Sequence, residues 1–246
     1  MRTTLGIGFL LLLATMTVTG STAAATPTYL YEARLVQAAP GKLLDLIDLY
    51  KTRSAAMRSG GDEPPMWMRH SQGDRWDLML LFPMSSYAEY YHPDRIARRA
   101  RADNQDLRER IAGDIYWQEE VFVYGPPLED LKKAFEGSAF FHVEMFQALP
   151  GRRADLYKER EMENAYLRTL REPDNFIFVR DKGAAWDLFT VGFYRNLKHY
   201  AESSDVPQKD QEAAARAAGF EDAGHIGPYL RTLISAHHDT LAVSIK

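Results

Sequence analysis

The chain has 246 residues, of which 46% are hydrophobic and 26% charged, and its formal net charge is −4. This composition excludes a largely disordered chain, and the lack of a basic surplus argues against a nucleic-acid partner. The sequence contains no cysteine, which excludes disulfides, thiolate catalysis, cysteine-ligated zinc and iron–sulfur clusters.

Residues 1–25 have the pattern of a secretory signal peptide. Arg2 supplies a short positive start, residues 5–16 form an apolar run, and three alanines ending at Ala25 offer a cleavage site. The run is shorter than the roughly 20 apolar residues that a membrane span needs. We therefore expect cleavage near Ala25 and a periplasmic or secreted protein with no membrane span after processing. An uncleaved anchor is the alternative.

The rest of the chain repeats itself at an offset of 110 residues, the distance between Gly73 and Gly183. Residues 29–41 read YLYEARLVQAAPG and residues 139–151 read AFFHVEMFQALPG, while a Trp-Asp-Leu sequence at 76–78 recurs at 186–188. Two clusters of identities in one register indicate a duplicated unit. We expect unit 1 in residues 26–125, a linker in 126–137 and unit 2 in 138–246.

Both units show the same order of elements: strand, helix, strand, strand, helix, strand. The expected ranges are 29–37, 42–58, 66–70, 76–82, 85–111 and 117–124 in unit 1, and 140–147, 152–170, 176–180, 186–193, 196–236 and 240–245 in unit 2. This βαββαβ order is the ferredoxin-like plan.

A duplicated βαββαβ unit resembles the dimeric α+β barrel superfamily, and the strand, Pro-Gly, helix and Trp-Asp-Leu features resemble its NIPSNAP/EthD-like branch. The resemblance implies an α+β fold in which two tandem ferredoxin-like units form a pseudo-dimer. Their sheets would face each other, and the enclosed space would be the ligand site. The resemblance leaves the function open, because that superfamily includes cofactor-free monooxygenases, isomerases, cyclases and haem enzymes.

Alternation along the first strand of each unit separates an apolar row of side chains from a polar row. The apolar rows contain Tyr31, Ala33, Leu35, Phe141, Val143 and Met145, and the polar rows contain Glu32, Arg34, His142 and Glu144. We expect the apolar rows to face the helices and the polar rows to face each other inside the barrel. Charges placed there would need partners or a function.

His142 and Glu144 are the expected catalytic residues, because one imidazole beside a carboxylate is enough for proton transfer near working pH. Glu32, Arg34 and His238 are the expected substrate-binding residues. His238 would join the pocket if the last strand of unit 2 begins early. The alternative is that these groups are structural polar pairs, and we interpret the repeated Trp-Asp-Leu as structural.

The sequence thus predicts an exported small-molecule-binding barrel, a cofactor-free acid/base enzyme of the oxygenase, isomerase or lyase type acting on an apolar or aromatic substrate. The alternative is a non-catalytic ligand-binding or protein-interaction module. A deep cavity open to His142 and Glu144 would favour the enzyme, and a filled barrel would favour the module. No cofactor is expected. A metal held by two histidines and a carboxylate, or haem held by His199, is an alternative without support, because the histidines match no metal motif and nothing around His199 matches a haem-binding protein. A homo-oligomer is a possible assembly.

Overall fold

The computed structural model describes residues 28–102 and 104–245, so the predicted signal peptide lies outside the described residues. Unit 1 consists of β1 (Tyr29–Ala38), α1 (Leu43–Ser59), β2 (Met66–Gln72), β3 (Leu78–Ser85), α2 (Tyr87–Tyr90), α3 (Pro93–Ala102), α4 (Gln105–Gly113) and β4 (Ile115–Gly125). After α5 (Leu128–Glu136), unit 2 consists of β5 (Phe140–Ala148), α6 (Arg153–Thr169), β6 (Phe176–Gly183), β7 (Leu188–Tyr194), α7 (Leu197–Ala201), α8 (Gln208–Ala218), α9 (Ile226–Arg231) and β8 (Ile234–Ser244).

The strands close into one barrel in the order β1-β3-β2-β8-β5-β7-β6-β4. Each unit contributes an antiparallel four-stranded sheet, β4-β1-β3-β2 from unit 1 and β8-β5-β7-β6 from unit 2, which is the ferredoxin-like order in both. The units join where β2 pairs with β8 and β4 pairs with β6. The predicted α+β pseudo-dimer is confirmed.

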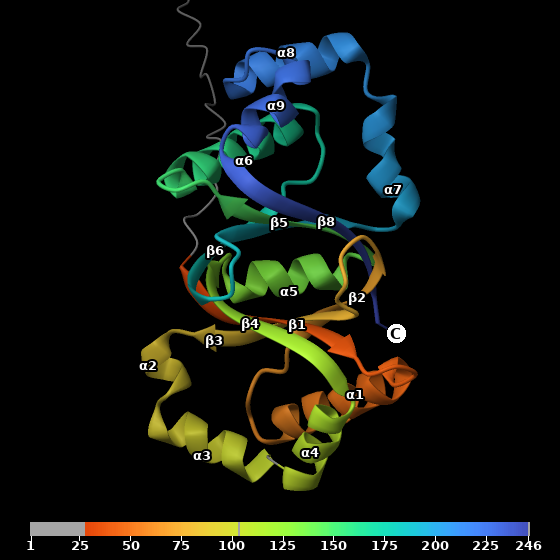
Figure 1. Cartoon of the computed structure of the whole chain (residues 1–246), viewed down its shortest axis with the longest axis vertical. Coiled ribbons are helices and arrows are strands. Elements are labelled where there is room, and N and C mark those ends of the chain that lie inside the picture. The colour runs from red at the N-terminus through yellow and green to blue at the C-terminus, as the bar shows by residue number, and fades with distance from the viewer. Residues whose placement is uncertain (1–27, 103, 246) are drawn as a thin grey trace, which may run out of the picture.

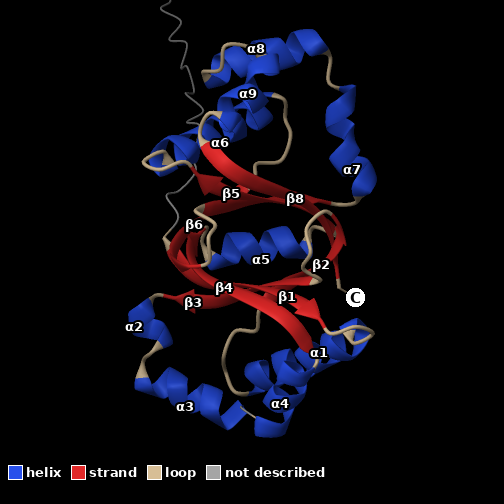
Figure 2. Ribbon diagram, viewed as in Figure 1, coloured by secondary structure: helices blue, strands red, loops and turns tan. Residues whose placement is uncertain are grey.

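The two units begin in the same way. Pro40-Gly41 and Pro150-Gly151 end the first strand, and both glycines adopt φ = +78°, a left-handed conformation that favours glycine. The helices α1 and α6 then start two residues later and cross the outer face of their own sheets. Figures 1 and 2 show α1, α3 and α4 outside one half of the barrel and α6, α8 and α9 outside the other.

The barrel interior is apolar, which corrects the predicted facing of the rows. Tyr31 and Phe141 are fully buried in one cluster to which strands of both units contribute. An interior of this size is filled by side chains and offers no water to a charge. The polar rows therefore point outward, where Glu144 meets Arg160 of α6 and Arg34 meets Glu120 of the neighbouring strand β4.

The segment that joins the units is helical and packs against the barrel interior. Leu131 of α5 is fully buried in the interior cluster, and Leu128 and Phe135 pack against it. The ring of Phe135 lies 5.2 Å from that of Phe141, centroid to centroid. Figure 1 shows α5 lying between the two halves of the sheet. The expected linker thus contributes to the core that the units share.

The repeated Trp-Asp-Leu has the same structural role in each unit. Asp77 Oδ2 accepts a hydrogen bond from the Ala38 amide at 2.8 Å, and Asp187 Oδ2 accepts one from the Ala148 amide at 2.9 Å. Each carboxylate thereby fixes the end of the first strand of its own unit.

Across the residues that the structure covers, no helix is both long and apolar enough to cross a membrane.

Candidate functional site

His142 and Glu144 lie side by side on the outer face of β5, beneath α6. The register of the sheet places Asp239 of β8 and Thr190 of β7 opposite Glu144. Thr190 donates a hydrogen bond of 3.2 Å to Glu144 Oε2. Both predicted catalytic residues are therefore on one surface, but that surface faces the helices of unit 2 rather than the barrel interior.

His142 is paired with Asp239, which the sequence analysis did not single out. His142 Nε2 lies 3.6 Å from Asp239 Oδ1, and His237 Nε2 lies 2.9 Å from Asp239 Oδ2. Burial alone would lower the pKa of the His142 imidazole, but the contact with Asp239 and the charge of Glu144 raise it overall. The same contact lowers the pKa of Asp239.

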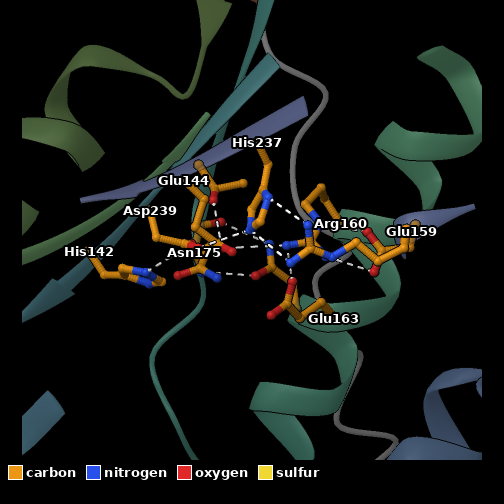
Figure 3. A network of polar contacts seen from close by, with 11 residues as sticks. His142, Glu144, Glu159, Arg160, Glu163, Asn175, His237 and Asp239 are labelled. Atoms are coloured by element: carbon orange, nitrogen blue, oxygen red, sulfur yellow. Dashed lines mark hydrogen bonds and ion pairs between the residues drawn. The ribbon is translucent and has the colours of Figure 1, made fainter. Parts of the chain in front are cut away.

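Arg160 of α6 holds the acidic groups of this surface together. It donates two hydrogen bonds to Glu159, from Nε at 2.6 Å and from Nη2 at 2.7 Å, and its Nη1 lies 3.4 Å from Glu144 Oε2. The same Nη1 forms an ion pair with Glu163. Only 2% of the Arg160 side chain is exposed, so one buried cation serves three carboxylates. Figure 3 shows these groups converging, with His142 and Asp239 at one end and Glu159 at the other.

Because acids outnumber Arg160, one of them holds its proton unusually tightly. Burial raises the pKa of Glu163 to about 7, Arg160 opposes that shift, and the charges of Glu144 and Glu159 add to it. The pKa of His142 is raised on the same surface. Two groups able to take up or release a proton near neutral pH thus lie within one network.

Aromatic rings border the His142 end of the network. The centroid of the Tyr200 ring is 5.5 Å from the His142 ring, 5.5 Å from Phe140 and 5.1 Å from Tyr194. Burial raises the pKa of both tyrosines, so their hydroxyls stay protonated. Because 53% of the Asp239 side chain and 19% of the His142 side chain are exposed, a small molecule could approach from this end.

Three residues of this surface also form a possible set of metal ligands. Ligand atoms of His142, Glu144 and Asp239 lie within 4.8 Å of one another, and such a donor set suits several divalent cations. However, Glu144 Oε2 is already an acceptor for Arg160 and Thr190. A divalent cation would have to displace the guanidinium, so the arrangement fits proton transfer better than metal binding.

The predicted substrate-binding residues do not join this site. Arg34 Nε donates to Glu32 at 3.0 Å and Arg34 Nη2 lies 3.0 Å from Glu120, all on the outer face of unit 1. Their expected placement inside the barrel was wrong, because the inward row is the apolar one. Their role in substrate binding stays a prediction.

His238 lies on the inward side of its strand, as expected, whereas His142 lies on the outward side of the neighbouring strand. The strand β8 begins early, at Ile234, as the prediction required. The register pairs His238 with Met145 of the inward row, and its Nδ1 lies 2.9 Å from Asp74 Oδ2. The neighbours Asp239 and His237 point to the His142 side instead. Strand alternation could have identified Asp239 and His237 as neighbours of His142 only if the register of β5 against β8 had been known.

Comparisons with known proteins support the fold. No family model matches the sequence, and no curated protein matches it either. The chain is similar to the crystal structure of an anthrone oxidase-like protein, with a TM-score of 0.58 and 12% identity over 89% of this chain and 92% of that one. It is also similar to a monooxygenase-like protein from Fusobacterium nucleatum subsp. nucleatum, with a TM-score of 0.54 and 9% identity over 90% and 94% of the two chains.

A monooxygenase-like protein from Lactobacillus acidophilus NCFM is a further match, with a TM-score of 0.51 and 8% identity over 88% and 93% of the two chains. These matches agree with the α+β fold expected from the sequence. At such low identity the likeness concerns the fold. The finer assignment to the NIPSNAP/EthD-like branch stays a prediction.

Proposed function

We propose that this protein is an exported small-molecule enzyme that transfers protons without an organic cofactor, acting on an aromatic or otherwise apolar substrate. The reaction would begin with removal of an acidic proton from the substrate, the step that oxygenases, isomerases and lyases of the cofactor-free kind have in common. The site would be the outer surface of β5 and β8 beneath α6 and α7, at His142.

The observation that carries this proposal is the pairing of His142 with a surplus of buried acid. The imidazole is held by Asp239 at 3.6 Å, and Glu163 has a pKa of about 7 within the same network. His142 would take or return the proton at the substrate, and Asp239 would orient the ring. Glu144, fixed by Arg160 and Thr190, would act as a constant charge rather than as a second acid or base.

The surroundings support an apolar substrate. Tyr200, which is partly exposed and packs on the buried rings of Phe140 and Tyr194, offers a ring face for stacking and a protonated hydroxyl that can donate a hydrogen bond to a developing oxyanion. The monooxygenase-like and anthrone oxidase-like neighbours agree with a small-molecule enzyme of this fold. The barrel interior is filled by side chains, the outcome that we expected for an interaction module. The enzyme proposal therefore depends on the surface beneath α6, on which His142 lies.

Proton–deuterium exchange tests the proposal without knowledge of the complete reaction. The protein is incubated in D2O with a panel of aromatic compounds that carry an acidic C–H bond, and exchange is followed by proton NMR. We expect accelerated exchange for one chemical class, and a loss of about 10²–10⁴-fold in His142→Gln, the range for one acid/base group. His92→Gln, which alters an exposed histidine, is the matched control.

Full exchange in His142→Gln, or no exchange with any compound of the panel, would contradict the enzyme and favour the non-catalytic ligand-binding module.

Export has a separate test, because the signal peptide of residues 1–25 is read from the sequence only. Amino-terminal sequencing of the protein from its native host should begin close after Ala25. A mature protein that retains Met1 would contradict export by cleavage.

A further inference from the structure

The acidic surface of unit 2 has a counterpart of opposite charge in unit 1. At the repeat offset of 110 residues, Glu144 on β5 corresponds to Arg34 on β1, and Glu163 on α6 corresponds to Arg53 on α1. The reversal occurs on the strand and on the helix that covers it. The two outer surfaces have therefore diverged together toward opposite charges.

Arg53 is a half-buried cation whose charge is not neutralised. Among the residues that the structure describes, no carboxylate forms an ion pair with its guanidinium. Of the acids nearby, Glu32 is bound by Arg34, and Asp62 is bound by Arg95 through Oδ1. Asp62 Oδ2 has no hydrogen-bond partner among the described residues. Burial lowers the pKa of Arg53, and the charge of Arg34 lowers it further. A desolvated cation of this kind is stabilised by an anion.

A second arginine of unit 1 also has unused hydrogen-bonding capacity. The guanidinium carbon of Arg99 lies 3.8 Å from the centroid of the Tyr90 ring, which fixes its position. Arg99 Nη1 is buried and has no hydrogen-bond partner among the described residues. A buried donor left without an acceptor is costly, so this group too would gain from an acceptor atom of a ligand.

Arg53 and Arg99 line the same cavity, which lies between α1, α3 and α4 and has a volume of about 340 Å³. Much of the remaining wall is apolar, with contributions from Met57, Ile96 and Leu107. Binding sites for small molecules combine such apolar walls with a few well-placed polar groups, and this volume is at the small end of their range. The wall also contains one acid, Asp62, and a third arginine, Arg108, so basic groups outnumber acidic ones in the lining.

We propose that this cavity of unit 1 binds a compact carboxylate with an aromatic or branched apolar body, held by Arg53 and Arg99. Guanidinium groups suit the planar, bidentate geometry of a carboxylate. The apolar residues favour an organic acid over a free inorganic anion. The site is separate from the proton-transfer surface of unit 2, and the two proposals stand or fall independently.

Isothermal titration calorimetry with 2-naphthoate tests the proposal on the full chain without its signal peptide. We expect binding of one molecule per chain, weakened at least tenfold in Arg53→Met and in Arg99→Gln. Arg58→Met removes an exposed positive charge from the same helix and should bind like the wild type. The alcohol 2-naphthylmethanol, which has the same apolar body without the charge, should bind at least tenfold more weakly than 2-naphthoate.

Three results would overturn the proposal. One is the absence of any binding heat with 2-naphthoate, and another is unchanged affinity in both Arg53→Met and Arg99→Gln. The third is equal binding of inorganic phosphate, which would show that the apolar wall has no role. Thermal unfolding checks the variants themselves: methionine at position 53 replaces an unneutralised cation and should keep the melting temperature. If Arg53→Met does not fold, Arg99→Gln, at a position on α3, decides alone.

Discussion

Burial and one neighbour act in opposite directions on the protonation of His142. Burial is the largest influence on its pKa and lowers it, and the contact with Asp239 is the largest of the influences that together raise the pKa overall. Asp239→Asn removes the charge while keeping the shape, so we expect the His142 pKa to fall below that in the wild type. Asp74→Asn is the control, because Asp74 contacts His238 on the other side of β8. Imidazole NMR titration measures both, and an unchanged His142 pKa in Asp239→Asn would contradict the assigned pairing.

Glu163 should make the protein less stable as the pH rises. Its folded pKa of about 7 lies above the value of about 4.3 for an unfolded chain, so the folded state binds the extra proton. This contribution to stability is complete below the unfolded pKa and is lost as the pH rises through the folded pKa. The raised pKa of His142 acts in the same direction.

We therefore expect the free energy of unfolding to fall between about pH 5 and pH 8, and to fall less steeply in Glu163→Gln. Urea unfolding at a series of pH values measures this slope. Glu161→Gln, at an exposed position of the same helix, should keep the wild-type slope. Equal slopes in wild type and Glu163→Gln would mean that Glu163 is ionised throughout this range.

At this scale the sequence predicts which residues share a face but not which side that face is on. Alternation correctly groups His142 with Glu144, because side chains two apart on a strand point the same way. Whether that row faces the barrel or a helix depends on what lies opposite, and Arg160, which attracts it, belongs to another element. The repeat itself held a further signal, since Arg160 replaces Tyr50 at the equivalent position.

Among the elements, α5 connects the two units and contributes to their shared core. The prolines at 126 and 127 indicate a linker in the sequence, and the segment does join the units. The spacing of Leu128, Leu131 and Phe135 is also that of one helix face. That the face is buried could not be deduced locally, because the surface that covers it is formed only when both sheets are in place.

Shortening a buried side chain of α5 should therefore destabilise the whole protein. Leu131 is fully buried in the interior cluster, and Leu131→Ala should cost about 2–5 kcal/mol of unfolding free energy through lost packing and a new cavity. Lys133→Ala, on the exposed side of the same helix, should change stability by less than about 0.5 kcal/mol. Urea unfolding measures both, and similar small losses would mean that α5 is a surface linker only.

The whole molecule is a pseudo-dimer in which each unit completes the other. The second strand of unit 1 pairs with the last strand of unit 2, and the last strand of unit 1 pairs with the second of unit 2. Two equivalent pairings of this kind are what a twofold-symmetric interface produces, because the same two surfaces meet twice. The sequence repeat predicts it, because duplicated units in one chain can replace two identical subunits.

The reciprocity makes a prediction about unit 1 expressed alone, as residues 28–125. In the complete chain its inward row, including Tyr31 and Val123, is fully buried against the other half of the barrel. The separated unit would expose that apolar face together with the unpaired edges of β2 and β4. Exposed apolar faces and open strand edges both promote association.

Two copies of unit 1 could satisfy these surfaces by pairing β2 of each copy with β4 of the other, as β2 pairs with β8 and β4 with β6 in the complete chain. We therefore expect the fragment to be a homodimer or an aggregate, with no folded monomer at micromolar concentration. Size-exclusion chromatography with light scattering gives the mass, and far- and near-ultraviolet circular dichroism shows whether the chain is folded. A folded monomer would contradict the prediction, because the inward face would then be stable in water without its partner.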